Sequence, residues 1–449
     1  MRKLMIAAMR SGSGKTILSC GLMTALRQRG LSVQACKCGP DYIDPMFHSS
    51  ALGIPSRNLD LFLQGRTGMR NTLKHCSADI VVMEAAMGYY DGIGGTDSCS
   101  AWEIAVETDT PVVLVLRPRG ESVTLAAQVR GMLDFRDRNM IRGLVFTDCR
   151  EALYRSLQGS LERETGLPVL GYLPPMEKAT LPERHLGLLT PGEITGIQER
   201  FSEIAAQIHQ TVDLDGLLSL TEEHVVTNPV KPVQYEHECR IAVARDEAFC
   251  FLYEDSLDRL RSAGAEICFF SPLHDRTLPD QTDGLYLPGG YPELHAEKLA
   301  KNRVMRQSVR KAVQSGLPTL AECGGFLYLQ ESMEDQNGKS WPMCGVMNGK
   351  AFRTECLQRF GYVNLIAEQD SLLFRKGETI PAHEFHYWDC TESGTDLLAE
   401  KPNGRSWRCG YTNEHLYAAF PHLHLGGVLP LAERFAEACR IWREKSSER

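Results

Sequence analysis

The sequence predicts an α/β protein with two doubly wound domains, and three observations support this fold class. An apolar run at residues 4–8 is followed by a glycine-rich turn and an amphipathic helix pattern over 17–28. Further apolar strands alternate with helical patterns, as expected for a mostly parallel sheet. Residues 222–238 then lose this periodicity and contain two prolines, and a new strand pattern follows at 240–244. We therefore expect domains at 1–221 and 239–449, joined by a linker at 222–238.

The composition is that of an ordinary globular protein. Of 449 residues, 43% are hydrophobic and 24% charged, and the net charge of −8 comes without any basic block. Nucleic acid and anionic membrane surfaces are therefore not expected as partners. No run of eighteen apolar residues occurs and the chain enters its first strand directly, so we expect a cytoplasmic protein without a transmembrane segment.

The cysteine and histidine spacings argue against a structural metal site. The 15 cysteines are scattered and form no CxxC pair, which disfavours zinc, iron–sulfur and disulfide frameworks. His383 and His386 are three residues apart, so they do not form the HExxH pattern of zinc proteases. We expect them, like most of the cysteines, to be structural residues.

The turn after the first strand predicts a site for nucleotide phosphates. It is formed by Ser11, Gly12, Ser13, Gly14, Lys15 and Thr16. In such a turn the backbone N–H groups and the helix N-terminus face the phosphates, while lysine reaches their terminal groups and threonine offers a hydroxyl to Mg²⁺. The full motif has glycine where this chain has Met9. The alternative is a flexible loop between a strand and a helix.

Acidic residues follow two further strands at the sheet edge where ligands bind in open α/β folds. The strand at 32–38 leads into Gly-Pro-Asp-Tyr-Ile-Asp-Pro, with Asp41 and Asp44, and the strand at 79–83 leads into Glu84. We expect Mg²⁺ at Thr16, Asp41 and Glu84. Ordinary turn chemistry is the alternative for the acids at 41 and 44.

Three other segments complete the first half. Strands are expected at 111–116, 143–146 and 169–173, and one amphipathic helix at 196–218. The block Leu-Pro-Glu-Arg-His-Leu-Gly-Leu at 181–188 fits either a structural network or an anion-binding loop. Asp91 lies in a glycine-rich loop and could bind an incoming ammonium and accept its proton, or be a turn residue.

The second half contains a candidate cysteine nucleophile. Cys323 lies on a sharp turn between a strand and a helix, which should expose its sulfur, aim a helix N-terminus at it and lower the thiol pKa. His422 is the expected base, and Gly290 and Gly324 can offer backbone N–H donors to an oxyanion. The alternative is a buried core cysteine.

Taken together, these motifs resemble the cobyrinic acid a,c-diamide synthase family over nearly the whole chain. The resemblance rests on the turn at 11–16 and on the blocks at 39–45, 87–92, 181–188, 288–293, 322–325 and 383–387. The blocks Gly-Pro-Asp-Tyr-Ile-Asp-Pro and Pro-Glu-Arg-His-Leu-Gly-Leu are specific to it, whereas a P-loop alone is not.

The resemblance implies a P-loop synthetase domain joined to a class I glutamine amidotransferase domain. Cys323 would release ammonia from L-glutamine with His422 as base. The synthetase domain would use ATP and Mg²⁺ to form an acyl phosphate on a tetrapyrrole carboxylate, which ammonia displaces. Family members amidate the a and c acetates of a corrinoid, and Tyr42, Ile43 and Asp44 lie in the block that contacts this substrate.

Some positions depart from the family pattern and some alternatives stay open. His424 stands where such amidotransferases often carry a glutamate, and Ala85 and Ala321 replace common glycines. A different tetrapyrrole such as nickel sirohydrochlorin, cobyric acid synthesis, and a non-catalytic P-loop regulator are the competing interpretations. The oligomeric state is not readable from the sequence.

Overall fold

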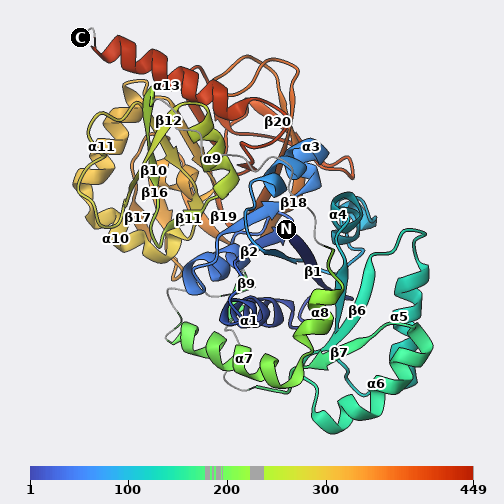
Figure 1. Cartoon of the computed structure of the whole chain (residues 1–449). Helices are drawn as coiled ribbons and strands as arrows, with labels where there is room; N and C mark the ends of the chain where they lie inside the picture. Colours follow the sequence, from blue (N-terminus) through green and yellow to red (C-terminus); the bar gives the residue numbers. More distant parts are fainter. Residues whose placement is uncertain (177–182, 185–186, 189–193, 195, 223–236, 448–449) are drawn as a thin grey trace. The chain divides into compact units, whose positions relative to one another are not determined.

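The computed structural model describes residues 1–176, 183–184, 187–188, 194, 196–222 and 237–447. These residues belong to two compact units (Figure 1). The first combines Met1–Leu61 with Gly65–Lys231, and the second combines Phe62–Gln64 with Pro232–Arg449. The predicted α/β fold class is confirmed. Residues 223–236 of the expected linker lie outside the described part of the chain, so the domain bounds stay a prediction.

The first unit is built on a parallel sheet of seven strands in the order β3-β2-β4-β1-β5-β6-β7. Its strands are β1 (Arg2–Ala8), β2 (Val33–Cys38), β3 (Ser56–Leu59), β4 (Ile80–Glu84), β5 (Val112–Leu116), β6 (Ile141–Phe146) and β7 (Val169–Tyr172). All but β3 were expected from the sequence. Because every strand runs in the same direction, the loops after β1, β2 and β4 meet at one sheet edge.

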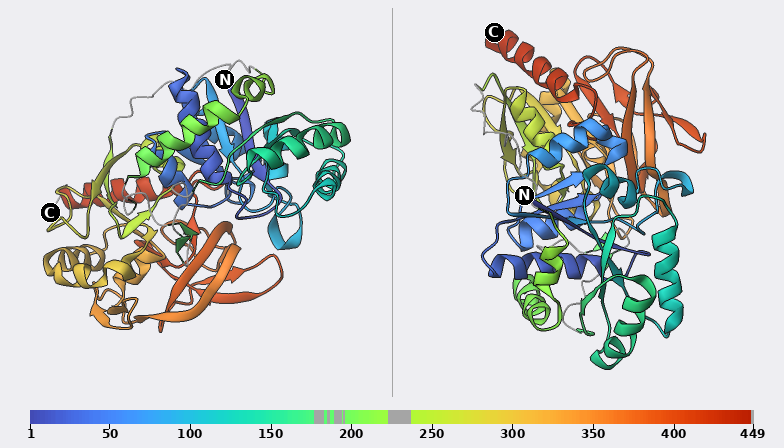
Figure 2. Two further views of the ribbon diagram at one scale, coloured as in Figure 1. Left: turned by 90° about the horizontal axis from the view of Figure 1, so that it is seen from below. Right: turned by 45° about the vertical axis from the view of Figure 1, so that its right-hand side comes forward.

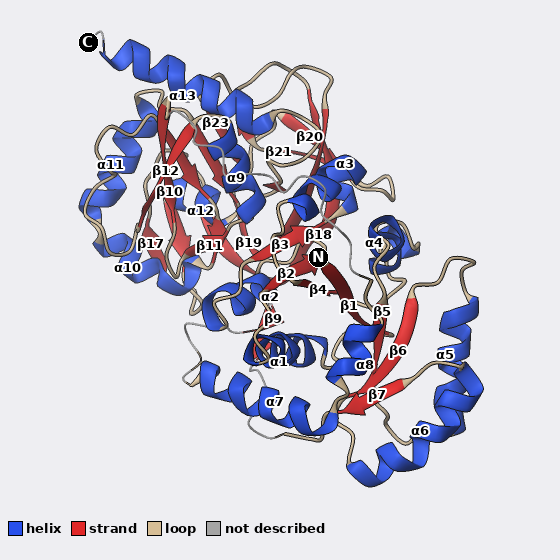
Figure 3. Cartoon of the chain, viewed as in Figure 1, coloured by secondary structure: helices blue, strands red, loops and turns tan. Residues whose placement is uncertain are grey.

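Helices cover both faces of this sheet (Figures 1 and 3). They are α1 (Lys15–Gln28), α2 (Ile43–Met46), α3 (Leu61–Lys74), α4 (Ala101–Thr108), α5 (Val123–Asp134), α6 (Glu151–Thr165), α7 (Ile197–Thr211) and α8 (Leu214–Ser219), with short turns η1 (Phe47–Ala51) and η2 (Ile93–Gly95). Apolar side chains of α4, α5 and α6 pack with alternate strand residues in one core cluster. Such burial on both faces explains the continuous apolar runs of the strands.

One helix prediction is wrong in detail. The single helix expected over 196–218 is broken into α7 and α8 at Val212 and Asp213. Val212 takes an extended conformation, and the Asp213 carboxylate accepts a hydrogen bond from the Gly216 N–H at 2.8 Å. Asp213 therefore caps a new helix, which apolar periodicity alone does not reveal.

Little of the 181–188 block is described. Its backbone forms a short antiparallel pair, β8 (Glu183–Arg184) with β9 (Gly187–Leu188). The other residues of the block lie outside the described residues, so its two proposed roles stay open.

The second unit contains a six-stranded sheet in the order β12-β10-β13-β15-β23-β22, parallel except for β22. The strands are β10 (Cys239–Ala244), β12 (Ala265–Phe270), β13 (Gly284–Leu287), β15 (Thr319–Glu322), β22 (Tyr411–Thr412) and β23 (Leu416–Ala419). The helices are α9 (Glu254–Ser262), η5 (Pro292–His295), α10 (Ala296–Lys301), α11 (Arg303–Gln314), α12 (Gly324–Leu329) and α13 (Leu431–Ser447). A separate two-stranded antiparallel sheet is formed by β11 (Phe249–Phe251) and β14 (Gly289–Gly290).

The second unit also contains a largely antiparallel sheet that the sequence did not predict (Figures 2 and 3). It is formed by β16 (Ser332–Glu334), β17 (Ser340–Pro342), β18 (Lys350–Ala367), β19 (Thr379–Cys390), β20 (Leu397–Glu400), β21 (Ser406–Cys409) and β24 (His422–Leu423). Strand β19 pairs with β24 through His383 and His422. This sheet thus supplies the strand that carries the expected catalytic histidine.

No helix within the described ranges is long and apolar enough to cross a membrane.

Candidate active sites

The glycine-rich turn of the first unit joins β1 to α1 as expected. Gly12 and Gly14 have positive φ angles of 72° and 84°, a conformation that other residues rarely adopt. Neighbouring loops brace the turn: Thr147 Oγ1 donates to the Ser13 carbonyl at 2.6 Å, and Arg117 Nη1 donates to the Gly12 carbonyl at 2.9 Å. The turn is therefore held open around the start of α1, where backbone N–H groups can receive an anion.

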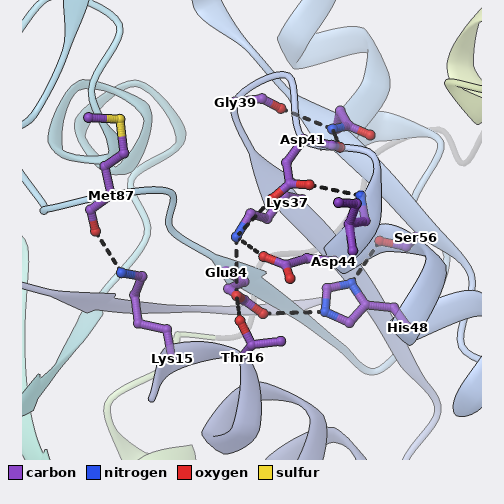
Figure 4. Close-up of polar contacts among 12 residues, drawn as sticks. Lys15, Thr16, Lys37, Gly39, Asp41, Asp44, His48, Ser56, Glu84 and Met87 are labelled. Atoms are coloured by element: carbon purple, nitrogen blue, oxygen red, sulfur yellow. Dashed lines mark hydrogen bonds and ion pairs between the residues drawn. The ribbon is translucent and has the colours of Figure 1, made fainter. Parts of the chain in front are cut away.

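Lys15 lies buried at the centre of this turn. Its ammonium donates to the Met87 carbonyl oxygen at 2.6 Å (Figure 4). It also donates to the Arg10 carbonyl oxygen at 3.3 Å. Burial, together with the charge of Lys37, lowers the pKa of Lys15 to about 8. Neutral carbonyls are weak partners for a buried ammonium, so a phosphate arriving here would be a stronger one.

A buried ion cluster follows the turn and draws its members from β2, β4 and α2 (Figure 4). The Lys37 ammonium contacts Asp44, lies 3.1 Å from Glu84 Oε1 and is 3.8 Å from Asp41 Oδ2. Thr16 Oγ1 donates to the same Glu84 oxygen at 2.7 Å. The expected pair Thr16 and Glu84 is therefore brought together, whereas Asp41 lies on the other side of Lys37.

The charges in this cluster are set by pairing. Burial disfavours the charged form of Glu84, yet Lys37 and His48 hold the pKa of Glu84 below its ordinary range. Asp44 and Glu84 keep the pKa of Lys37 well above its ordinary value despite burial. Burial and the Glu84 charge raise the pKa of Asp44, because two buried carboxylates share one ammonium. Removing any one charged member would leave an uncompensated charge buried among the others, which is strongly destabilising.

Two members of the cluster were missed by sequence reasoning. Lys37 and His48 are both buried, and His48 Nε2 lies 3.4 Å from Glu84 Oε2 while its Nδ1 contacts Ser56 Oγ at 2.9 Å. The available signal for Lys37 was a lysine inside a predicted strand of a doubly wound sheet, since lysine is almost never buried without a partner.

The remaining candidate residues of the first unit occupy different settings. Asp91 is exposed, and its Oδ2 accepts a hydrogen bond from the Gly88 N–H at 2.9 Å, as a turn residue would. Asp41 Oδ1 accepts from the Ile43 N–H at 2.8 Å. Tyr42 is half-buried and Ile43 is buried at the start of α2. Their predicted roles toward a substrate stay predictions.

In the second unit, Cys323 lies between β15 and α12 in a strained conformation, with φ at 45° and ψ at −103°. The strand-to-helix turn was expected, but the exposed sulfur and lowered thiol pKa were not found. Cys323 is only 5% exposed, and burial raises the pKa of its thiol. A hydrogen bond from the Gly324 backbone at the start of α12 acts in the opposite direction but is outweighed by desolvation.

His422 follows β23, the strand that pairs directly with β15. Glu322 is in register with Ala419, and the Cys323 N–H donates to the Ala419 carbonyl at 2.8 Å. Cys323 and His422 therefore leave neighbouring parallel strands at the same sheet edge. His422 is buried, and this burial lowers its pKa to about 3.

The two expected oxyanion glycines are adjacent and lie beside this pair. A Cβ on Gly324 would be 3.1 Å from the Gly290 backbone nitrogen. A Cβ on Gly289 would be 2.4 Å from His422 Cε1, so only glycine lets the imidazole lie against this backbone. The structure thus brings Cys323, His422, Gly290 and Gly324 into one site.

Sequence reasoning missed a carboxylate next to His422. Glu322 is fully buried, and its Oε2 lies 4.0 Å from His422 Nδ1. His424, which stands at the position often taken by glutamate, is also buried, and this burial lowers its pKa to about 3. His386 instead pairs with Glu384, with Nε2 2.8 Å from Oε1. Among the described residues, no group of His, Cys, Asp and Glu has the arrangement of a metal site.

Comparisons with known proteins assign a domain family to each half of the chain. Residues 4–189 match the CobQ/CobB/MinD/ParA nucleotide binding domain, and residues 240–428 match the CobB/CobQ-like glutamine amidotransferase domain. A cobyrinate a,c-diamide synthase of Listeria monocytogenes is 41% identical, with 94% of this chain and 96% of the relative covered. One of Caldanaerobacter subterraneus is 36% identical, with 99% and 100% covered. The first unit is therefore a nucleotide-binding domain and the second a glutamine amidotransferase domain.

Proposed function

The chain belongs to the cobyrinate a,c-diamide synthase family of glutamine-dependent ligases, and from this premise we propose that it converts the a and c acetate carboxylates of cobyrinic acid to amides. Glutamine supplies the nitrogen and ATP the driving force. The observation that carries the proposal is the presence in one chain of a phosphate-binding turn with a buried threonine–carboxylate pair and of a cysteine–histidine–glycine site. Relatives named for this reaction match both halves.

In the amidotransferase site, Cys323 is the nucleophile toward the side-chain amide of glutamine. His422 takes the thiol proton as sulfur attacks the amide carbon, and returns it to the departing nitrogen as ammonia leaves. The N–H groups of Gly290 and Gly324 stabilise the oxyanion. Burial disfavours both the thiolate and the imidazolium, so these ions form only as the proton moves from Cys323 to His422.

In the synthetase site, the turn at 11–16 binds the phosphates of ATP and Lys15 carries charge to the transferred group. Attack of a substrate carboxylate oxygen on the terminal phosphorus would give an acyl phosphate and ADP. Ammonia then attacks the acyl carbon, and phosphate leaves with the C–O bond electrons. Neutralising the phosphates is the main contribution of this site, since phosphoryl transfer depends on positioning and charge.

The residues also fit Mg²⁺. Thr16 Oγ1 and Glu84 present hard oxygen ligands 2.7 Å apart, and the second Glu84 oxygen, Oε2, is buried 3.4 Å from His48 Nε2. Thr16 and Glu84 would hold the ion, whereas the Lys37 ammonium stands between Glu84 and Asp41, the third residue expected there. A bound Mg²⁺ would supply positive charge that offsets the negative charge of the phosphates.

Four further residues follow strands β2 and β4 at the same sheet edge and are proposed to act on the tetrapyrrole or on ammonia. We assign Tyr42, Ile43 and Asp44 to contacts with the tetrapyrrole and Asp91 to the incoming ammonium. The position of Asp91 supports this second role only in part, because its Oδ2 already accepts from Gly88. Its exposed carboxylate retains a second oxygen for a cation.

The proposal is tested by incubating the protein with ATP, Mg²⁺, glutamine and one tetrapyrrole at a time, and counting amides by mass spectrometry. Cobyrinic acid should gain two amides. Nickel sirohydrochlorin is the matched competitor, and its preferential diamidation would replace the assigned substrate while keeping the chemistry. No ATP turnover and no glutamine hydrolysis with any tetrapyrrole would instead support a non-catalytic regulator.

A further inference from the structure

Glu322 occupies a position that the cysteine–histidine chemistry leaves unexplained. It immediately precedes the nucleophile, yet its side chain points to the opposite face of β15, as alternation along a strand requires. There it is completely buried with His422. A buried carboxylate beside the catalytic base needs a reason, because burying a charged or polar group without partners is unfavourable.

The hydrogen bonds of Glu322 direct it toward His422. Its Oε1 accepts from the backbone N–H of Leu423 at 2.8 Å, and Leu423 is the residue that follows His422. Its Oε2 accepts from the Tyr286 hydroxyl at 2.9 Å and lies 4.0 Å from His422 Nδ1. The carboxylate is thus fixed to the strand that carries the imidazole. An approach of roughly 1 Å would form a hydrogen bond to the ring.

Two other titratable groups of this region, Glu384 and His424, have partners of their own. Glu384 faces His386 at 2.8 Å and Arg359 at 3.6 Å. His424 Nδ1 accepts from the Gly426 N–H at 3.2 Å. Among the described ion pairs of His422, Glu322 is the carboxylate partner.

We propose that Glu322 is the positioning carboxylate of the amidotransferase site, orienting His422 through Nδ1 and stabilising its imidazolium. This inference rests on the proposed function of Cys323 and His422. With Nδ1 turned toward Glu322, Nε2 is the nitrogen left for the thiol. The S–H bond breaks as Nε2–H forms, the sulfur electron pair bonds to the amide carbon, and the carbonyl pair moves to oxygen. The doubly protonated ring then donates Nδ1–H to Glu322 until Nε2–H protonates the leaving ammonia.

This role explains how a histidine so deeply buried can act as a base. Burial lowers the pKa of His422 to about 3, so an isolated ring would hold the thiol proton poorly. Burial raises the pKa of Glu322 as well, to about 8, although the Leu423 N–H and the Tyr286 hydroxyl favour its charged form. In that charged form, the carboxylate on the far side of the ring offsets the desolvation of His422 when the imidazolium appears. The same logic operates in serine protease triads, where a carboxylate orients the histidine and stabilises its charged form.

The test compares Glu322→Gln with Tyr286→Phe in the full chain. Glu322→Gln keeps the shape but replaces the carboxylate, and should lower kcat for glutamine hydrolysis by about 10²- to 10⁴-fold with little change in KM. Ammonium-dependent amidation and the unfolding temperature should stay close to the parent values. Tyr286→Phe removes the donor to Glu322 but leaves the carboxylate, and should retain most glutamine hydrolysis.

Two results would overturn the inference. One is parental kcat in Glu322→Gln. The other is an equal loss in both variants with lowered unfolding temperatures, which would make Glu322 a structural anchor for Tyr286. A parent protein without any glutamine hydrolysis would instead overturn the proposed function itself, and with it this role.

A measurement on the parent protein covers the case in which Glu322→Gln does not fold. Cys323 is alkylated with a chloromethyl ketone analogue of glutamine in protein labelled with ¹⁵N-histidine. A charged His422 should then show a strongly downfield Nδ1–H proton resonance, the signature of a hydrogen bond to a carboxylate. An Nδ1–H resonance in the ordinary imidazole range would contradict the assignment.

Discussion

The two sites of this chain are both built on a turn between a parallel strand and a helix, yet they treat charge in opposite ways. The first buries charged groups and pairs them: Lys37 with Asp44 and Glu84, beside Thr16 at the end of the phosphate turn. The second buries Cys323 and His422 in forms that burial keeps neutral. A site for a charged ligand is prepared with compensating charges, whereas a site for a neutral amide can stay dry until the reaction creates its ions.

The largest difference between glutamine-dependent and ammonium-dependent amidation is expected from Cys323→Ser. Glutamine-dependent amidation should fall by up to about 10⁶-fold, as for removal of other enzyme nucleophiles. Amidation with high ammonium should persist, because free ammonia bypasses only the thiol step. Both rates are measured on the same tetrapyrrole. Loss of both would mean that Cys323 is needed for folding.

The opposite result, loss of amidation with glutamine hydrolysis retained, is expected from Lys15→Ala and from Glu84→Gln. Each should lower amidation from either nitrogen source by about 10²- to 10³-fold, since each removes charge or ligands from phosphoryl transfer. Glutamine hydrolysis, assayed without tetrapyrrole, should continue. A variant with the parental rate of amidation would remove its residue from the synthetase site.

Lys37→Met tests the pairing of buried charges in the first site. It leaves Asp44 and Glu84 buried without their ammonium, which should destabilise the first unit by about 3–5 kcal/mol. Urea unfolding monitors the change. The control is Lys301→Met, which breaks an exposed pair with Glu297 and should change stability by less than about 1 kcal/mol. Equal effects in the two variants would show that the cluster contributes no special stability.

Acid should weaken the second unit through its buried histidines. His383, His422 and His424 each have a pKa lowered to about 3 by burial. They bind protons in the unfolded chain from about pH 6.5 downward but not in the folded one. The contribution of these neutral histidines to the free energy of unfolding is therefore complete above that pH. It is lost as the pH falls toward 3, at up to about 1.4 kcal/mol per pH unit for each histidine.

Unfolding by urea between pH 7 and pH 5 measures this effect. His424→Gln should reduce the slope of stability against pH by the contribution of one histidine. Equal slopes in the parent and His424→Gln would contradict the assigned protonation state.

The smallest effect is expected for Asp91→Asn. Binding of ATP and tetrapyrrole should remain, while amide formation slows and the stranded acyl phosphate hydrolyses. The ratio of phosphate released to amide formed should therefore rise. An unchanged ratio at an unchanged rate would leave Asp91 as the turn residue that its bond to Gly88 describes.

The parts of the molecule that the sequence predicted are those coded by local patterns. The turn from Ser11 to Thr16 and the turn at Cys323 each lie in one short segment, so motif and strand–helix context identify them. Lys37 was missed because its partner is set by the register of β2 on β4, where Lys37 lies opposite Glu84. Glu322 was missed for the same reason, since only the pairing of β15 with β23 brings it to His422.

The antiparallel sheet of the second unit escaped prediction for a different reason. Its longest pair, β18 with β19, has register shifts between Arg353 and Gly361 that interrupt regular alternation. The sulfur environment was likewise predicted wrongly, because a turn motif gives backbone shape but not the burial around a side chain. Cys323 is covered by residues distant in sequence.

The central claim, that the two sites serve one reaction, is tested most directly by nitrogen transfer. The parent protein is incubated with cobyrinic acid, ATP, Mg²⁺ and glutamine labelled with ¹⁵N in its side-chain amide, and the product is analysed by mass spectrometry. Both new amides should carry ¹⁵N. Release of labelled ammonia with no labelled amide on the corrinoid would contradict the account.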